Sequence, residues 1–239
     1  PATLTTTDGT TVSTANTYTG ATTIGDGSVL KAGGVGGFAA ASPHTLAGTG
    51  TLDLAGAANT VGALVSASPA TVVTSSAGGP AVLTVAGLSA GSFAGTIRDG
   101  VAPLGPPPAA DTPTLTAANT YTGVTTIGRG ATLRLGDGGT AGAIVATAGV
   151  VNDGALVFDR TDAVSFAPAI SGSGSLTQAG GGTTVLTGRN TNTGATTIRG
   201  GTLQIDGVLA ASEVTVKSGG TLAGSGKIGD PLIEAGGRL

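Results

Sequence analysis

The chain has 239 residues, of which 45 are glycine, 10% are charged and none is cysteine, and its formal net charge is −3. This composition offers no basic patch for phosphates and no thiol for disulfides, metal sites or nucleophilic catalysis, so we expect no nucleic-acid partner. A hydrophobic fraction of 39% is too high for a charge-rich disordered chain, while 3% aromatic residues are too few for an ordinary compact core.

The first predicted element is a strand–turn–strand unit near the N-terminus. The sequence reads Asn16-Thr-Tyr-Thr-Gly-Ala-Thr-Thr-Ile24, and apolar and polar residues then alternate through Leu30-Lys-Ala32. Alternation of this kind is typical of a strand with one buried face. The same nine-residue signature returns at irregular spacing at Asn119–Ile127 and Asn190–Ile198, and a degenerate copy starts at Asn59. Each full copy is followed by a second alternating stretch, at Leu133-Arg-Leu135 and Leu203-Gln-Ile205.

The nine-residue signature contains residues that suit a tight corner. Asparagine tolerates a left-handed backbone and hydrogen-bonds its own neighbouring backbone, and glycine takes a positive φ without strain. Tyrosine can pack over such a corner. An alternative interpretation is that the asparagines contact a ligand and that the tyrosines form an exposed aromatic strip. We predict structural corners at Asn16, Tyr18, Gly20, Asn119, Tyr121, Gly123, Asn190 and Gly194.

A second signature is a seven-residue segment with an apolar residue at each end and two glycines inside. It occurs at Leu46–Leu52, Ile170–Leu176 and Leu222–Ile228. Further alternating runs lie at Gly50–Leu54, Ala81–Val85, Ala155–Phe158 and Glu213–Lys217. No segment shows helical spacing, and the frequent glycines would each cost a helix about 1 kcal/mol. We therefore predict an all-β fold in which short strands stack as rungs, each paired with the rungs above and below.

One stretch interrupts the pattern. Residues 101–113 contain five prolines, which cannot donate to a strand ladder. We predict a Pro-rich loop or hinge here, between a first β-helix block at residues 1–100 and a second block at residues 114–239.

Candidate catalytic and ligand-binding residues are few. The single histidine, His44, and the Gly87-Leu-Ser-Ala-Gly91 pattern would be needed for a serine hydrolase, but no predicted helix follows that pattern, so a turn is favoured for both. Asp159 and Asp162 are the closest pair of acids, and we expect an exposed ion pair between Asp159 and Arg160. Gly136-Asp-Gly-Gly139 is an isolated fragment of a calcium-binding repeat. We predict no catalytic residues, no metal site and no cofactor.

The repeated segments resemble the autotransporter-associated β-strand repeat, also called the passenger-associated transport repeat. The resemblance rests on Asn-Thr-Tyr-Thr-Gly-Ala-Thr-Thr-Ile followed by Gly-Thr-Leu-Gln-Ile, and on Ala155–Asp162, Phe93–Gly100 and Val214–Ile228. It implies a right-handed, single-stranded parallel β-helix in the passenger of a type V secretion protein of a Gram-negative bacterium. Asn192 in place of tyrosine and the Pro-rich insert depart from the family pattern.

The same resemblance implies a function and a location. The segment would assist export, folding and display of the passenger at the cell surface or outside the cell, attached to the outer membrane through a translocator barrel that lies elsewhere in a longer chain. No apolar run approaches the roughly 20 residues of a membrane helix, so we expect no direct membrane insertion of this segment. Two alternatives stay open: an adhesin that binds a host or bacterial cell-surface ligand or its own kind, and a β-helix polysaccharide lyase or glycosidase.

Overall fold

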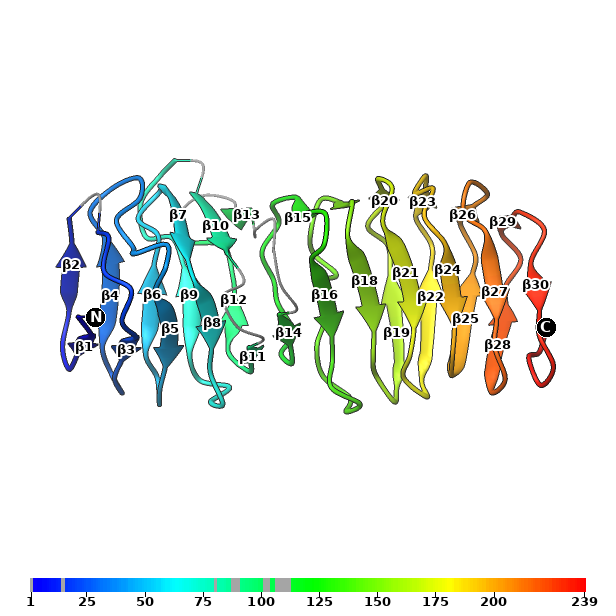
Figure 1. Cartoon of the computed structure of the whole chain (residues 1–239), viewed down its shortest axis with the longest axis horizontal. Coiled ribbons are helices and arrows are strands. Elements are labelled where there is room, and N and C mark those ends of the chain that lie inside the picture. Colours follow the sequence, from blue (N-terminus) through cyan, green and yellow to red (C-terminus); the bar gives the residue numbers. More distant parts are fainter. Residues whose placement is uncertain (1, 14–15, 80, 87–90, 101–103, 106–112) are drawn as a thin grey trace.

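The computed structural model describes residues 2–13, 16–79, 81–86, 91–100, 104–105 and 113–239. These residues form a long rod with its two ends at opposite poles, and the strands run across the rod (Figure 1). All strands pair in parallel, and the described residues contain no helix. Neighbouring strands in a sheet are about twenty residues apart in sequence, as in a solenoid whose turns stack on each other. The predicted all-β parallel β-helix is therefore confirmed.

The first half of the rod contains three parallel sheets. The first sheet consists of β1 (Leu4–Thr6), β3 (Thr22–Ile24), β5 (Pro43–Leu46) and β8 (Ala63–Val65). The second consists of β2 (Thr10–Val12), β4 (Val29–Ala32), β6 (Thr51–Asp53), β9 (Val72–Thr74) and β12 (Thr96–Ile97). The third consists of β7 (Ala58–Val61), β10 (Ala81–Val85) and β13 (Leu104–Gly105).

The second half contains three further sheets and most of a fourth. The eight-stranded sheet consists of β11 (Ser92–Phe93), β14 (Thr114–Leu115), β16 (Thr132–Leu135), β18 (Ala155–Phe158), β21 (Ser175–Gln178), β24 (Thr196–Ile198), β27 (Val214–Val216) and β30 (Leu232–Ile233). One three-stranded sheet consists of β15 (Thr125–Ile127), β17 (Val150–Asn152) and β20 (Ile170–Ser171). The four-stranded sheet consists of β19 (Ala163–Phe166), β22 (Thr183–Leu186), β25 (Gly201–Ile205) and β28 (Gly220–Ala223). The last sheet consists of β23 (Arg189–Asn190), β26 (Val208–Leu209) and β29 (Lys227–Ile228).

Aliphatic columns fill the interior of the rod. Leu30, Leu52, Val73 and Ile97 stand in register on four successive turns, and each is at most 2% exposed. Burial of such a side chain stabilises the fold by about 1.5–3 kcal/mol, so each turn gains about this much free energy for each aliphatic side chain that it adds to the column. Lys31, which lies between buried neighbours on β4, faces outward and is half-buried. The predicted alternation is thus confirmed, as it is at β16 and β25.

Some predictions lie outside the described residues. Of the Pro-rich segment 101–113, the structure describes only β13 and Pro113, and β13 pairs in parallel with β10. The loop or hinge predicted there, and the division into blocks at residues 1–100 and 114–239, remain predictions. The same holds for most of Gly87–Gly91. Among the described residues, no helix is long and apolar enough to cross a membrane.

Candidate functional site

The asparagines of the repeat corners hold neighbouring turns together. Asn119 is 1% exposed, and its Oδ1 accepts a hydrogen bond from Ile97 N on the previous turn at 2.9 Å. Its Nδ2 donates to Ala117 O two residues back at 3.0 Å and to Ala143 O on the next turn at 3.1 Å. One side chain therefore satisfies backbone groups on three turns, which is what a buried amide requires.

The other asparagines repeat parts of this arrangement. Asn190 is 2% exposed and accepts from Ile170 N at 3.0 Å, and Asn59 of the degenerate copy accepts from Phe38 N at 3.2 Å. Asn16 is half-buried and donates to Gly37 O on the next turn at 2.7 Å. The amide nitrogens of Asn59 and Asn190 also donate to backbone carbonyls, so Asn59, Asn119 and Asn190 have no free amide group to offer a ligand.

The backbone at the corners differs from the prediction. Ala55 is the one non-glycine residue with a positive φ among the described residues, so the asparagines are not left-handed. Gly20 and Gly194 do not have a positive φ either. They are glycines because a Cβ would lie 2.0 Å from Ala2 O and 2.2 Å from Gly174 O, respectively. The close approach of the neighbouring turn, rather than the turn conformation, requires glycine here.

Behind each corner lies a chain of buried hydroxyl groups. In the first repeat, Tyr18 OH lies 2.8 Å from Thr22 Oγ1, which lies 2.8 Å from Ser42 Oγ on the next turn. Ser42 Oγ also lies 2.7 Å from Gly20 O and donates to it. Each hydroxyl thus has a partner, which offsets the cost of burying it.

The second repeat has the same chain. It links Tyr121 OH, Thr125 Oγ1, Thr147 Oγ1 and Gly123 O at 3.0, 3.1 and 2.5 Å. Tyr121 is 1% exposed and packs inside, whereas Tyr18 is half-buried. Burial raises the pKa of the Tyr121 hydroxyl above its usual value, although the hydrogen bond with Thr125 acts in the opposite direction.

The third repeat lacks the first member of this chain. Thr196 Oγ1 and Ser212 Oγ lie 2.7 Å apart, and Ser212 Oγ lies 2.7 Å from Gly194 O. Asn192 occupies the tyrosine position, is 0% exposed, and neither its Oδ1 nor its Nδ2 has a hydrogen-bond partner. A tyrosine at this position, as in the first two repeats, would give the Thr196 hydroxyl the partner that Tyr18 gives Thr22.

The seven-residue glycine segments receive an aspartate from the previous turn. Asp26 Oδ1 accepts from Thr49 N at 2.8 Å and Thr49 Oγ1 at 2.9 Å, and Asp153 Oδ1 accepts from Ser173 N and Ser173 Oγ, both at 2.9 Å. In the third such segment, Ser225 N donates to Asp206 Oδ1 at 3.4 Å. We call each contact of this kind an aspartate staple.

The two glycines of each segment have separate tasks. The first has a positive φ in all three segments, at Gly48, Gly172 and Gly224. The second lies against the previous turn, since a Cβ on Gly174 would be 2.4 Å from Gly154 O and one on Gly226 would be 2.2 Å from Gly207 O. The central Thr or Ser is thereby turned outward toward the aspartate.

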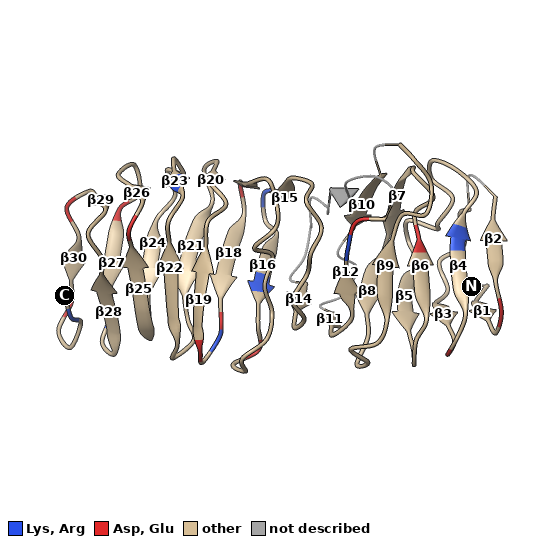
Figure 2. Ribbon diagram, turned by 180° about the vertical axis from the view of Figure 1, so that it is seen from behind, with Lys and Arg blue, Asp and Glu red and all other residues tan. Residues whose placement is uncertain are grey.

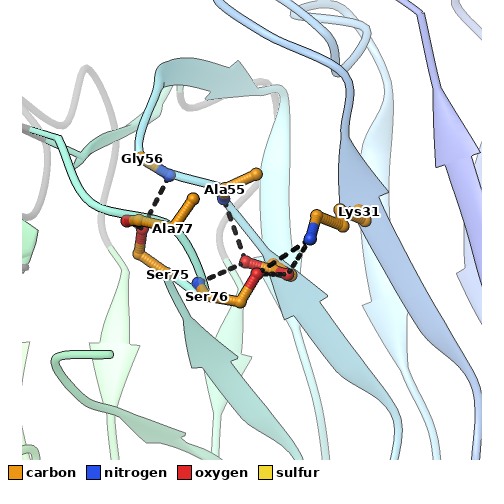
Figure 3. Close-up of polar contacts among 7 residues, drawn as sticks. Lys31, Ala55, Gly56, Ser75, Ser76 and Ala77 are labelled. Atoms are coloured by element: carbon orange, nitrogen blue, oxygen red, sulfur yellow. Dashed lines mark hydrogen bonds and ion pairs between the residues drawn. The ribbon is translucent and has the colours of Figure 1, made fainter. Parts of the chain in front are cut away.

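Hydrogen bonds stabilise the charged form of the stapling carboxylates. The bonds from Thr49 lower the pKa of Asp26, and those from Ser173, aided by the charge of Arg129, lower the pKa of Asp153. Asp53 forms a more enclosed staple (Figure 3) with Ser76 N at 2.8 Å, Ser76 Oγ at 2.5 Å and Ala55 N at 2.9 Å. Burial would raise the pKa of Asp53, but these bonds and Lys31 Nζ at 3.7 Å outweigh burial and lower it.

The remaining chemical candidates do not come together. His44 lies in strand β5 rather than in a turn and is 0% exposed. Its Nδ1 lies 2.9 Å from Ser42 O, so this nitrogen carries the proton, and its Nε2 has no partner. Among the described residues, no carboxylate forms an ion pair with its ring.

The predicted ion pair between Asp159 and Arg160 is wrong. Asp159 pairs with Arg134 on the previous turn, and Arg160 binds Asp162 at 2.8 Å. Arg160 is 9% exposed and also donates to Thr140 O and Gly142 O, so it fixes the backbone of residues 140–142. The planar guanidinium suits several such acceptors at once.

Charged residues are sparse along the rod (Figure 2), and several of them form ion pairs, such as Arg134 with Asp159 and Lys217 with Glu234. In the part of the chain that the structure describes, no three His, Cys, Asp or Glu residues are grouped so as to hold a metal ion. The repeated polar sites are therefore contacts between turns. Sequence reasoning missed Ser42, Thr147 and Ser212, which each follow an alanine, and Asp26, Asp153 and Asp206, which each precede a glycine.

Comparison with known proteins finds similarity in sequence. The model of the passenger-associated transport repeat matches residues 45–74, 110–135 and 176–205. These ranges contain the second and third full copies of the nine-residue signature and the degenerate copy at Asn59, whereas the copy at Asn16 lies outside them. The adhesin BmaC autotransporter of Brucella suis is 50% identical over 58 residues, which is 24% of this chain and 2% of that protein. No solved structure matches the chain.

Proposed function

This chain carries the repeats of autotransporter passengers, and from that premise we propose that it is a structural segment that assists export, folding and surface display. The supporting observation is that each turn pairs its strands with the turns directly before and after it. Strand pairs, corner asparagines and aspartate staples all join residues about twenty positions apart. Each turn that closes on the stack therefore gains free energy without waiting for a distant segment.

This mode of folding suits passage through an outer membrane. Little ATP or membrane potential is available outside the inner membrane, so a chain that folds turn by turn at the exit would bias its own movement outward. We propose a translocator barrel in the same full-length protein as the partner, and the cell surface as the location. The absence of cysteine fits, because no premature disulfide can form during transit.

Leu203→Asp tests the proposal in the full-length protein. Leu203 is 0% exposed, and a buried carboxylate without a partner prevents its turn from closing. We expect a severalfold slower appearance of the passenger at the cell surface, followed by protease accessibility on intact cells. Thr202→Asp, on the same strand with an outward side chain, is the matched control and should be exported normally. Normal export of Leu203→Asp, with its purified segment unfolded, would contradict the proposal.

A second candidate function is adhesion, which the similarity to an autotransporter adhesin favours. Outward-facing threonines such as Thr177, Thr197 and Thr215 stand in register on successive strands and form an uncharged column. An adhesive segment should bind cells or cause clumping when displayed, and deletion of residues 101–113 should abolish this. A segment that only supports the passenger shows neither effect.

A further inference from the structure

We propose that the corner of the second repeat is a joint that couples two separately cooperative blocks of the rod, one before residue 101 and one after residue 112. Breaking this joint would let one block lose its structure while the other keeps it. The inference goes beyond the proposed function and does not depend on it.

The first observation is where the sheets end. Three sheets end at β8, β12 and β13, and three begin at β15, β19 and β23. Among the described residues, only the eight-stranded sheet has strands on both sides of this boundary. Figure 1 shows the short β13 and β14 between the longer strands of the two halves.

The ladder that crosses the boundary is short. Strands β11 and β14 pair over two residues each, whereas β18 and β21 pair over four. Inside the second half, two further ladders accompany the eight-stranded sheet on the same turns, from β22 to β25 and from β23 to β26. Backbone pairing alone therefore holds the halves together less firmly than it holds turns within one half.

The corner of the second repeat supplies the missing connections. Asn119 Oδ1 accepts from Ile97 N at 2.9 Å, and Thr120 N donates to Ile97 O at 3.0 Å. Asp99 staples Thr122, accepting from its N at 3.0 Å and its Oγ1 at 2.6 Å. The edge of β12 that would otherwise lack a partner strand is thus closed by a side-chain amide and a carboxylate.

Packing is also incomplete at this position. A cavity of about 30 Å³ lies between apolar residues of the first half, Leu83, Phe93 and Ile97, and residues of the second, Leu115, Tyr121 and Leu133. Side chains around a cavity lose dispersion contacts with each other. The two halves therefore share less core at the joint, and the contacts of Asn119 account for a larger part of their coupling.

Native-state hydrogen exchange of the whole chain in increasing urea, read by mass spectrometry, tests the joint. In Asn119→Ala, we expect peptides from residues 22–97 and peptides from residues 150–216 to lose protection at urea concentrations clearly further apart than in the unchanged protein. Asn119→Asp keeps an acceptor for Ile97 N but turns a charged oxygen toward Ala117 O and Ala143 O, so its separation should be at least as large as that of Asn119→Ala.

Asn190→Ala is the matched control. Its Oδ1 makes the same contact with Ile170 N at 3.0 Å, but it lies inside the second half. We expect it to lower protection on both sides of residue 190 together. The proposal is overturned if Asn119→Ala lowers protection equally in both halves, unfolds them together, or leaves the separation unchanged.

Discussion

Acidification should destabilise this rod through its single histidine. His44 is completely buried, its Nδ1–H is bound to Ser42 O, and its unprotonated Nε2 has no hydrogen-bond partner. Thr22 and Leu64 flank it on the neighbouring turns, and the Phe38 ring packs against it at 5.7 Å between centroids. Protonation would place an unpaired charge among these groups, so burial lowers the pKa of His44 to about 4, although the bond to Ser42 acts in the opposite direction.

The size of the effect follows from the two pKa values. The unfolded chain takes up the proton near pH 6.5 and the folded chain near pH 4, so the unfolded state binds more protons between these values. Stability is therefore full above pH 6.5 and falls as the pH drops toward 4. The loss amounts to about 2 kcal/mol by pH 5 and about 3 kcal/mol by pH 4.

Urea denaturation at pH 7, 6 and 5 measures this loss. His44→Leu is the control, because leucine stands in the same column one turn later at Leu64 and does not titrate. Its stability at pH 7 should lie within about 1 kcal/mol of the unchanged protein, since it loses one hydrogen bond but also one unpartnered nitrogen. Equal stability of the unchanged protein at pH 7 and 5, or the same loss in His44→Leu, would refute the reasoning.

Three further predictions concern the contacts between turns. Gly174→Ala should destabilise the rod by about 1–3 kcal/mol in thermal unfolding because its Cβ would lie 2.4 Å from Gly154 O, whereas Gly181→Ala has open space and should be nearly neutral. Asn192→Tyr should raise the free energy of unfolding by about 1 kcal/mol, because it removes two unpartnered amide atoms and gives the Thr196 hydroxyl a tyrosine hydroxyl as a partner. A lower melting temperature would contradict this and show that the site has closed around asparagine. Asp153→Ala should lower the melting temperature at pH 7 more than Asp137→Ala, an exposed aspartate that also precedes a glycine. That difference should shrink as the pH falls below 3.8 and through the lowered pKa of Asp153, because hydrogen bonds from Ser173 stabilise the charged carboxylate and protonation weakens the staple; a difference that stays the same as the pH falls would count against the staple.

The sequence by itself determined the strands and their buried faces. Stretches such as Leu133-Arg-Leu135 alternate over adjacent residues, and a period of two is a local property that needs no knowledge of the partner strand. The seven-residue glycine segments could likewise be recognised locally, because glycine adopts a positive φ without strain, as it does at Gly48, Gly172 and Gly224. Stacking of these strands into a parallel solenoid followed, since none of them can bury its inner face alone.

Only the tertiary structure decided which residues meet between turns. The number of residues per turn varies, so Asp26 reaches Thr49 and Asp153 reaches Ser173 across different sequence separations, and no local pattern specifies these partners. The stacking of the turns also set His44 between Thr22 and Leu64 and paired Asp159 with Arg134 instead of Arg160. It also explains why Gly194 is a glycine: its neighbour Gly174 O approaches from another turn, and that distance exists only once the turns are stacked.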